Sequence, residues 1–159
     1  MNIELVPVQE KDKSIVANLL ELYEYDFSEF IGTDVDEQGK YGYQYLDFYW
    51  LEPNRHPFLI KVDGNIGGCV LVNLNVPAEK ESNVHSIAEF FVMRKYRRNG
   101  VGRHIANKIF DAFPGKWAVT QLNENKAAQI FWKNVIQEYT GGNFQVQETP
   151  NGLVLTFSN

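Results

Sequence analysis

The residues best suited to chemistry lie between Glu89 and Arg103, where an apolar segment leads into a basic turn that contains glycines. Five of the fifteen basic residues fall between Arg94 and Arg103, with no acidic residue among them, in a chain of net charge −5. Glycines let an anion approach the backbone, and the first N–H groups of a helix are unpaired and carry the positive end of its dipole. Arginines add charge-assisted donors. The turn therefore has the components of a diphosphate site.

Two common phosphate motifs do not fit this turn. A P-loop would need Gly-Lys-Ser/Thr, and the dinucleotide fingerprint would need a third glycine where the chain has Ile105. A solvated basic turn at a glycine-rich helix start would show the same residues, so the turn alone leaves that alternative open.

The Arg-x-x-Gly-x-Gly pattern at residues 97–102, directly after Phe91-Val92, resembles the coenzyme A signature of the GNAT (GCN5-related N-acetyltransferase) family. A second motif of that family, Asn-x-x-Ala at a helix start, is matched at residues 125–128, in the family's element order. The resemblance implies acetyl-CoA as cosubstrate, with its diphosphate on the turn and its pantetheine arm along Phe91 and Val92. The coenzyme-binding residues that it implies are Phe91, Val92, Arg97, Arg98, Asn99, Gly100, Val101, Gly102, Arg103 and Asn125.

One position departs from the pattern of the resembled family. Many members carry a tyrosine, often the acid that protonates the departing thiolate, where this chain has Trp132. An indole N–H donates hydrogen bonds but is no acid at neutral pH. Tyr139 lies on roughly the same face of the predicted helix but about 10 Å further along, so we do not assign it the role. We expect water to supply the proton, or the thiolate to leave unprotonated.

Acetyl transfer to an amine needs a base, because a free alkyl amine has a pKa of about 10.4 and only its neutral form attacks. Glu89 is the predicted base, since it lies two residues before Phe91 and both side chains should share one face of the strand. Pairing with a nearby base, or a place at the sheet surface, is the alternative for this carboxylate. The N–H groups of Phe91 and Val92 could polarise the acetyl carbonyl.

Two other side chains have types that could take part in the chemistry. The same alternation puts His85 on the face of Glu89, where it could relay protons, although a polar residue at the start of a strand is the simpler interpretation. Cys69 is interpreted as a small buried hydrophobic residue, because no histidine or basic neighbour would activate it.

The acceptor side is suggested by an acidic and aromatic segment. Between Ser14 and Gly39 there are seven acidic residues and no lysine or arginine, and six of the eight tyrosines lie between Tyr23 and Tyr49. In the resembled family the first two helices wall the acceptor pocket, and such a wall suits a cation. We expect a cationic amine, on a small molecule or a peptide; a solvated acidic helix over an aromatic core is the alternative. The predicted substrate-binding residues are Glu24, Tyr25 and Phe27.

The elements that must position these residues alternate between the two periodicities. Their order predicts one α/β (α+β) domain over residues 1–159, with a mixed, mostly antiparallel sheet of six or seven strands flanked by about four helices, which is also the acetyltransferase fold that the resemblance implies. The predicted strands are residues 3–8, 58–62, 66–74, 84–93, 117–122, 144–148 and 153–157, and the predicted helices are residues 15–27, 43–50, 100–113 and 125–139.

Composition narrows the partners. With 44% hydrophobic and 22% charged residues among 159, the chain suits one soluble domain. Its acidic balance makes nucleic acid an unexpected partner, and a single cysteine excludes a cysteine-based metal site, so no metal is expected. No apolar run reaches the roughly 20 residues of a membrane span, and the N-terminus has no signal-peptide pattern, so we expect a cytoplasmic protein without membrane contact. An exposed edge of the last hairpin could pair two chains as a homodimer.

The primary hypothesis is an acetyl-CoA-dependent N-acetyltransferase that acts on a primary amine by direct attack in a ternary complex. The main alternative is a catalytically weak acyl-CoA sensor or interaction module of the same fold, and a nucleotide-binding protein is a third. Coenzyme binding without thiol release would favour the sensor.

Overall fold

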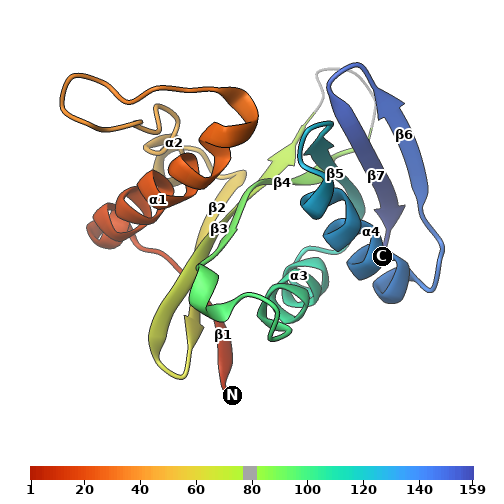
Figure 1. Cartoon of the computed structure of the whole chain (residues 1–159). Coiled ribbons are helices and arrows are strands. Elements are labelled where there is room, and N and C mark those ends of the chain that lie inside the picture. The colour runs from red at the N-terminus through yellow and green to blue at the C-terminus, as the bar shows by residue number, and fades with distance from the viewer. Residues whose placement is uncertain (77–81) are drawn as a thin grey trace.

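The computed structural model describes residues 1–76 and 82–159, and within them the strands form one seven-stranded sheet in the order β1-β2-β3-β4-β5-β7-β6 (Figure 1). Neighbouring strands are antiparallel except β4 and β5, which are parallel. The predicted mixed, mostly antiparallel sheet is confirmed. The strands are β1 Ile3–Pro7, β2 Arg55–Val62, β3 Asn65–Asn75, β4 Val84–Val92, β5 Lys116–Leu122, β6 Gln145–Thr149 and β7 Gly152–Ser158.

The four α-helices of the described residues cover both faces of the sheet (Figure 1). One buried cluster joins the sheet to the first two helices, and a second joins it to the last two. The stripe of α3 is typical: Val101, Ile105 and Ile109 recur every four residues and are fully buried. The helices are α1 Lys13–Ile31, α2 Phe48–Leu51, α3 Val101–Ala112 and α4 Lys126–Thr140, with short 3₁₀ turns at Glu10–Asp12 and Arg94–Tyr96.

The second predicted helix is shorter than expected. Only α2 is α-helical, and residues 43–47 before it form successive turns in which the Leu46 N–H donates to Tyr43 and the Tyr49 N–H to Leu46. Each of these bonds spans three residues rather than four. Leu46 and Tyr49 are the buried side chains of the segment, and three-residue turns are enough to bring both against the sheet.

Strand β4 leaves an opening in the sheet. It pairs with β5 at two positions, Val84 with Lys116 and His85 with Trp117, although both strands continue. From Ser86 onward its β5 side has no strand partner among the described residues. β4 is therefore only half-buried over most of its length, although it is the middle strand of seven.

A β-bulge accompanies this opening. Ile87 pairs with Val72 and Glu89 pairs with Leu71, so that Ala88 has no opposite residue on β3. A bulge bends its strand and increases the local twist. Because β4 bends at this point, it parts from β5 while it stays paired with β3.

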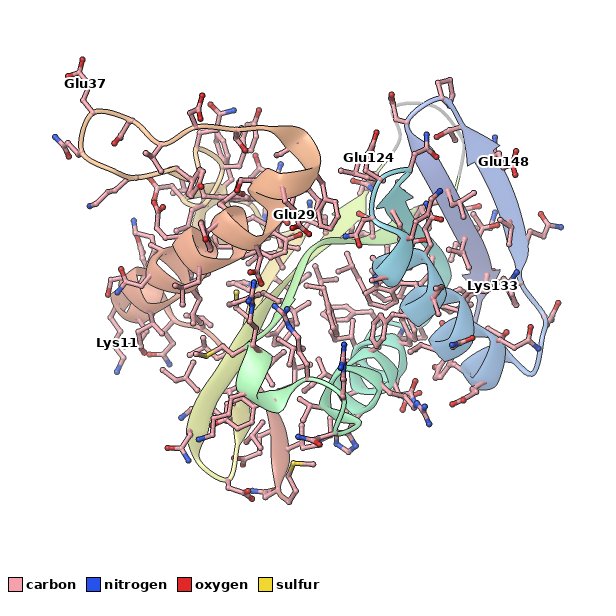
Figure 2. The ribbon with its side chains drawn as sticks, in the orientation of Figure 1. Lys11, Glu29, Glu37, Glu124, Lys133 and Glu148 are labelled. Carbon is pink, nitrogen blue, oxygen red and sulfur yellow. The ribbon has the colours of Figure 1, made fainter. Side chains whose placement is uncertain are left out.

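The outer surface is charged and polar. Lys11 precedes α1, Lys133 lies on α4, and Glu148 lies on β6 at the edge of the sheet (Figure 2). In the described ranges none of the helices combines the length and apolar sequence that crossing a bilayer requires. Pairing of two chains through β6 stays a prediction; the exposed Glu148 charge on this edge works against it.

Candidate active site

The turn between β4 and α3 presents free backbone donors. The N–H groups of residues 98–103 donate to no described residue, and the first N–H of α3 that finds a partner is that of His104, which donates to the Gly100 carbonyl at 3.0 Å. Arg98 (φ 63°) and Gly100 (φ 79°) are both left-handed. Left-handed residues change the direction in which successive N–H groups point and help to form concave sites for anions. Together with the dipole of α3, the turn can hold a diphosphate through its main chain.

The side chains of this turn do less than its backbone. Arg98 and Asn99 are exposed to solvent. Arg103 is directed at α4, where its Nη1 lies 3.3 Å from Glu138 Oε2, and both partners of this ion pair are exposed. An exposed pair of this kind holds a side chain weakly, so Arg103 remains available to an anion.

The glycine and asparagine of the two motifs are explained by packing and capping. A Cβ at Gly102 would lie 3.1 Å from the ring of Phe131, so a side chain there would require the ring or α3 to give way. The Asn125 Oδ1 accepts a hydrogen bond from the Ala128 N–H at 3.0 Å and caps α4. The cap fixes where α4 begins and thereby where Phe131 meets α3.

The main chain of β4 presents alternate groups to its unpaired side. The N–H of Met93 donates to β3 at 2.8 Å, and Val92 lies opposite Gly68. This is a non-hydrogen-bonded antiparallel pair, in which the N–H and C=O of Val92 point away from β3. The same alternation directs those of Phe90 outward and those of Phe91 toward β3, where a Cβ at Gly68 would collide with the Phe91 carbonyl oxygen.

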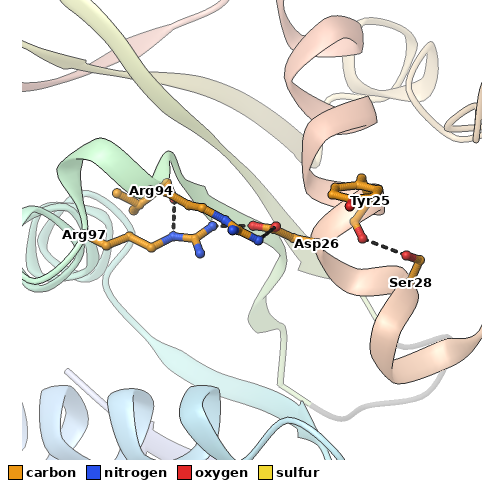
Figure 3. Close-up of polar contacts among 6 residues, drawn as sticks. Tyr25, Asp26, Ser28, Arg94 and Arg97 are labelled. Atoms are coloured by element: carbon orange, nitrogen blue, oxygen red, sulfur yellow. Dashed lines mark hydrogen bonds and ion pairs between the residues drawn. The ribbon is translucent and has the colours of Figure 1, made fainter.

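Arg97 reaches toward α1 (Figure 3). Its Nε donates to the Val92 carbonyl at 2.7 Å and its Nη2 to Asp26 Oδ2 at 2.6 Å, while Arg94 Nη2 donates to Asp26 Oδ1 at 2.6 Å. Burial would raise the pKa of the Asp26 carboxyl, but the hydrogen bonds from Arg97 and Arg94 outweigh it and hold the pKa below its ordinary value. The guanidinium of Arg97 is therefore engaged by protein groups.

Glu89 lies in a partly buried group on the α1 side of the sheet, the same face as Phe91. The Tyr43 hydroxyl donates to Glu89 Oε1 at 3.1 Å. Burial raises the pKa of Glu89 to about 7, although the Tyr23 and Tyr43 hydroxyls stabilise the carboxylate and lower it. Burial, and then the charge of Glu89, raises the pKa of both tyrosines, which stay protonated. A carboxyl group that titrates near neutral pH can accept a proton from a substrate and release it again.

His85 does not share this face, and the prediction that it would is wrong. Its ring stacks on Trp117 at 5.1 Å and contacts Phe113 at 5.5 Å, on the side of α3 and α4. The extra residue of the bulge, Ala88, inverts the alternation between His85 and Glu89. Strict two-residue counting cannot detect such an insertion.

A cavity of about 580 Å³ adjoins this group. Glu21 shapes it, because its carboxylate accepts hydrogen bonds from the N–H groups of Tyr41 at 2.9 Å and Gly42 at 3.0 Å and so holds this segment to α1. Tyr43 lines the cavity and also contacts Glu89, so a ligand in the cavity would lie near the Glu89 carboxyl group. The lining residues are Glu24, Tyr41, Gly42, Tyr43, Gln44 and Tyr45.

Of the predicted substrate-binding residues, Glu24 lines this cavity. Phe27 packs one turn from Tyr23, with ring centroids 5.4 Å apart, and supports the wall from behind. Tyr25 is 66% exposed and does not line the cavity, because a residue two positions from Tyr23 points to another side of a helix. Its carbonyl accepts a hydrogen bond from the Ser28 hydroxyl at 2.7 Å (Figure 3).

Sequence reasoning missed Tyr23 and Tyr43 as partners of Glu89, and Asp26 as the partner of the arginines. The tyrosine-rich segment was the available signal, but which tyrosine reaches the carboxylate depends on the path of residues 41–47. Tyr43 and Glu89 are 46 positions apart.

Three other side chains that the sequence raised as candidates for the chemistry have structural roles. Trp132 is 6% exposed and packs edge-on against Phe90 at 4.9 Å. The Tyr139 hydroxyl donates to Asp111 Oδ1 at 2.8 Å, near the end of α4. Cys69 is fully buried, and burial raises the pKa of its thiol to about 12, so it carries almost no thiolate at neutral pH.

Comparison with known proteins places these features in context. The family model described as Acetyltransferase (GNAT) family matches residues 19–135. An acetyltransferase from Thermus thermophilus is similar over 100% of this chain and 98% of its own, with a TM-score of 0.73 and 17% identity. Aminoglycoside acetyltransferase AAC(6')-Ib, solved with coenzyme A, gives 0.65 and 14% (99% and 95% covered). Arabidopsis thaliana NAA60, solved with a bisubstrate analogue, gives 0.63 and 13% (99% and 97%). No curated protein matches the sequence.

Proposed function

The chain belongs to the acetyltransferase (GNAT) family, and we propose that it transfers an acetyl group from acetyl-CoA to the primary amine of a small molecule or peptide. The proposal rests on the close arrangement of three features along β4 and the turn after it. They are the unpaired backbone amides of the turn, the opening between β4 and β5, and a carboxyl group whose pKa is near neutral. The first two suit an elongated diphosphate ester, and the third suits an amine that must lose a proton. Acetyl-CoA would supply the activated acetyl thioester.

The coenzyme would be held mainly by backbone groups. The free N–H groups of residues 98–103 would bind its diphosphate, with Arg98 and Arg103 adding charge at the surface. The outward groups of β4 would bind its amide-containing arm. These belong to Phe90 and Val92, so Phe90 takes the backbone role that the sequence assigned to Phe91.

Glu89 would act as the base, directly or through a water. Its pKa of about 7 lets it accept a proton from the acceptor ammonium, and the Tyr43 hydroxyl holds the carboxylate in place. The N–H of Val92 points to the open side of β4 and could polarise the acetyl carbonyl. Trp132 cannot protonate the leaving thiolate, so this proton would come from water or not be needed.

The acceptor would occupy the 580 Å³ cavity and be cationic. Tyrosine rings and the Glu24 carboxylate line it, which suits an ammonium group through cation–π contact and ion pairing. Burial and the neighbouring Glu21 charge raise the pKa of Glu24, and a cationic ligand would oppose both effects by attracting the carboxylate charge.

A thiol-release screen tests the proposal. The protein is incubated with acetyl-CoA and a panel of primary amines that differ in charge, beside matched neutral alcohols and the Glu89→Gln variant. We expect thiol release with at least one cationic amine, and its loss in Glu89→Gln. Coenzyme binding with no release across the panel would favour the sensor, and absence of coenzyme binding would refute both.

A further inference from the structure

Two residues of α1, three positions apart, hold the two halves of the site. Tyr23 packs its ring against Phe91, on the face of the sheet that also carries Glu89. Asp26 reaches the turn after β4 and accepts hydrogen bonds from Arg94 and Arg97, each at 2.6 Å (Figure 3). Residues three apart lie on one side of a helix, so any movement of α1 shifts both contacts together.

Phe91 packs against both Tyr23 and Arg97 and so links the two contacts. The ring of Tyr23 lies against it with centroids 5.7 Å apart, and the guanidinium carbon of Arg97 lies 5.9 Å from its centroid. Arg97 also binds the carbonyl of Val92 at 2.7 Å. The end of β4, the turn and α1 are thus joined through one guanidinium group.

The Asp26 contact differs from an ordinary surface ion pair. The Asp26 side chain is 21% exposed and each of its oxygens has its own arginine partner, although the arginines themselves are more exposed, Arg94 at 76% and Arg97 at 41%. The pair spans 71 positions of the sequence, between the acceptor side and the coenzyme side. Neither element needs the contact in order to fold locally.

We propose that Asp26 is a positioning residue that couples the coenzyme turn to the acceptor wall: it fixes Arg97 beneath the turn and holds α1, with Tyr23, against Glu89. Coenzyme binding, which immobilises the turn, thereby stiffens the second half of α1 before the acceptor arrives. The inference rests on the proposed coenzyme binding and adds an order to the reaction. It also assigns Arg97 to the protein scaffold rather than to the phosphate.

Calorimetric titration with coenzyme A separates this role from direct phosphate binding. If the contact positions the turn, Asp26→Asn and Arg97→Gln each weaken binding about fivefold, and the double variant is no weaker than either. If Arg97 bound the phosphate, Asp26→Asn would free it and tighten binding, which would overturn the proposal. Glu29→Gln, which makes the same charge change on the same helix with no hydrogen-bonded partner among the described residues, should stay within about twofold of the parent.

Hydrogen exchange of α1 supplies a readout that general destabilisation does not give. On addition of coenzyme A, peptides from residues 19–31 should exchange more slowly in the parent protein. In Asp26→Asn that slowing should disappear while the slowing at the start of α3 remains. The Arg94→Gln variant removes the more exposed of the two arginine partners of Asp26, so it should lose only part of the slowing of exchange in α1.

The outcomes also separate the inference from the proposed function. If the parent protein does not bind coenzyme A, the function proposal fails. If it binds and α1 slows equally in Asp26→Asn, the coupling proposal fails alone. If Asp26→Asn is unfolded by circular dichroism, the double variant Arg94→Gln with Arg97→Gln carries the same comparison, since it leaves Asp26 in place and removes both of its arginine partners.

Discussion

The two faces of the sheet present different kinds of groups to a ligand. On the side of α3 and α4, the groups offered to a ligand belong to the main chain, and the side chains around them serve packing: Gly102 admits Phe131, and Asn125 caps a helix. On the side of α1 and α2, side chains do the work, with Glu89 held by Tyr43 and a cavity shaped by Glu21. A main-chain site depends on local conformation, whereas the side-chain site depends on contacts between distant segments.

This difference predicts how each half tolerates change. The main-chain half should fail when its backbone cannot keep its shape, whatever side chains surround it. The side-chain half should fail by the loss of individual functional groups while coenzyme binding survives. Four substitution experiments, from the largest expected effect to the smallest, test this separation.

Glu89→Gln should break the acceptor half alone. Without a base, kcat/KM for the amine should fall by about 10² to 10³, because positioned proton transfer contributes this much. The Kd for coenzyme A should stay within about twofold of the parent. Steady-state kinetics with the amine found in the screen, beside calorimetry, measures both. A drop in coenzyme affinity as large as the drop in rate would show that the halves are not separate.

Gly102→Ala should break the coenzyme half alone. The added Cβ would meet the Phe131 ring at 3.1 Å, so the ring or α3 must give by a few tenths of an ångström. If α3 moves, we expect a cost of about 1–3 kcal/mol in the free energy of unfolding and weaker coenzyme binding. Denaturant unfolding and calorimetry measure the two effects. The double variant Gly102→Ala with Phe131→Leu should recover coenzyme affinity. A failure to recover would mean that the glycine is needed for the ligand and not for the helix contact.

The pH dependence of kcat/KM should show whether Tyr43 stabilises the carboxylate of Glu89. Glu89 has a pKa raised to about 7, so its base form, and with it kcat/KM, should grow as pH rises through about 7. Tyr43→Phe removes a hydrogen bond that lowers this pKa, so the rise should move to higher pH by about one pH unit. Tyr45→Phe, which lines the same cavity without contacting Glu89, is the control. Identical profiles for the two variants would remove Tyr43 from the proposed mechanism.

Glu24→Gln should give the smallest effect, and this effect should be on which acceptor the protein prefers. Removing a partly exposed carboxylate should reduce the preference for a cationic over a neutral amine by about fivefold, chiefly through KM. Competition between two amines of similar size measures this ratio directly. An unchanged ratio would indicate that the tyrosines alone select the acceptor.

The fold was predictable because its signals are local. Stripes such as Val101, Ile105 and Ile109 define helices, and the hairpin around Gly64 follows from turn chemistry. The turn at residues 97–102 was predictable for the same reason, since its glycines and the helix start are neighbours in sequence, and its binding of a coenzyme stays a prediction. The bulge at Ala88 was not predictable. A single inserted residue changes the face of the sheet on which the neighbouring side chains lie, without any change in composition.

The acceptor half was predictable only as a region. Acidic and aromatic composition pointed to α1 and the following segment, but Tyr25 turned out exposed and Tyr23 and Asp26 carry the contacts. Helical phase selects between such neighbours, and it is set by which residues the sheet buries. The pairing of Asp26 with Arg97 depends on the final packing of α1 against the end of β4, which no local pattern records.

Because Cys69 is buried, the reactivity of its thiol can report how often the structure around it opens. Cys69 lies on β3 opposite Leu59 and Phe91, in the buried cluster beneath α1 and α2, so an alkylating reagent can reach it only when that cluster opens. The rate of its labelling would therefore follow the population of molecules with an open centre. A coenzyme that braces β4 should slow this labelling, without any probe being attached to the protein.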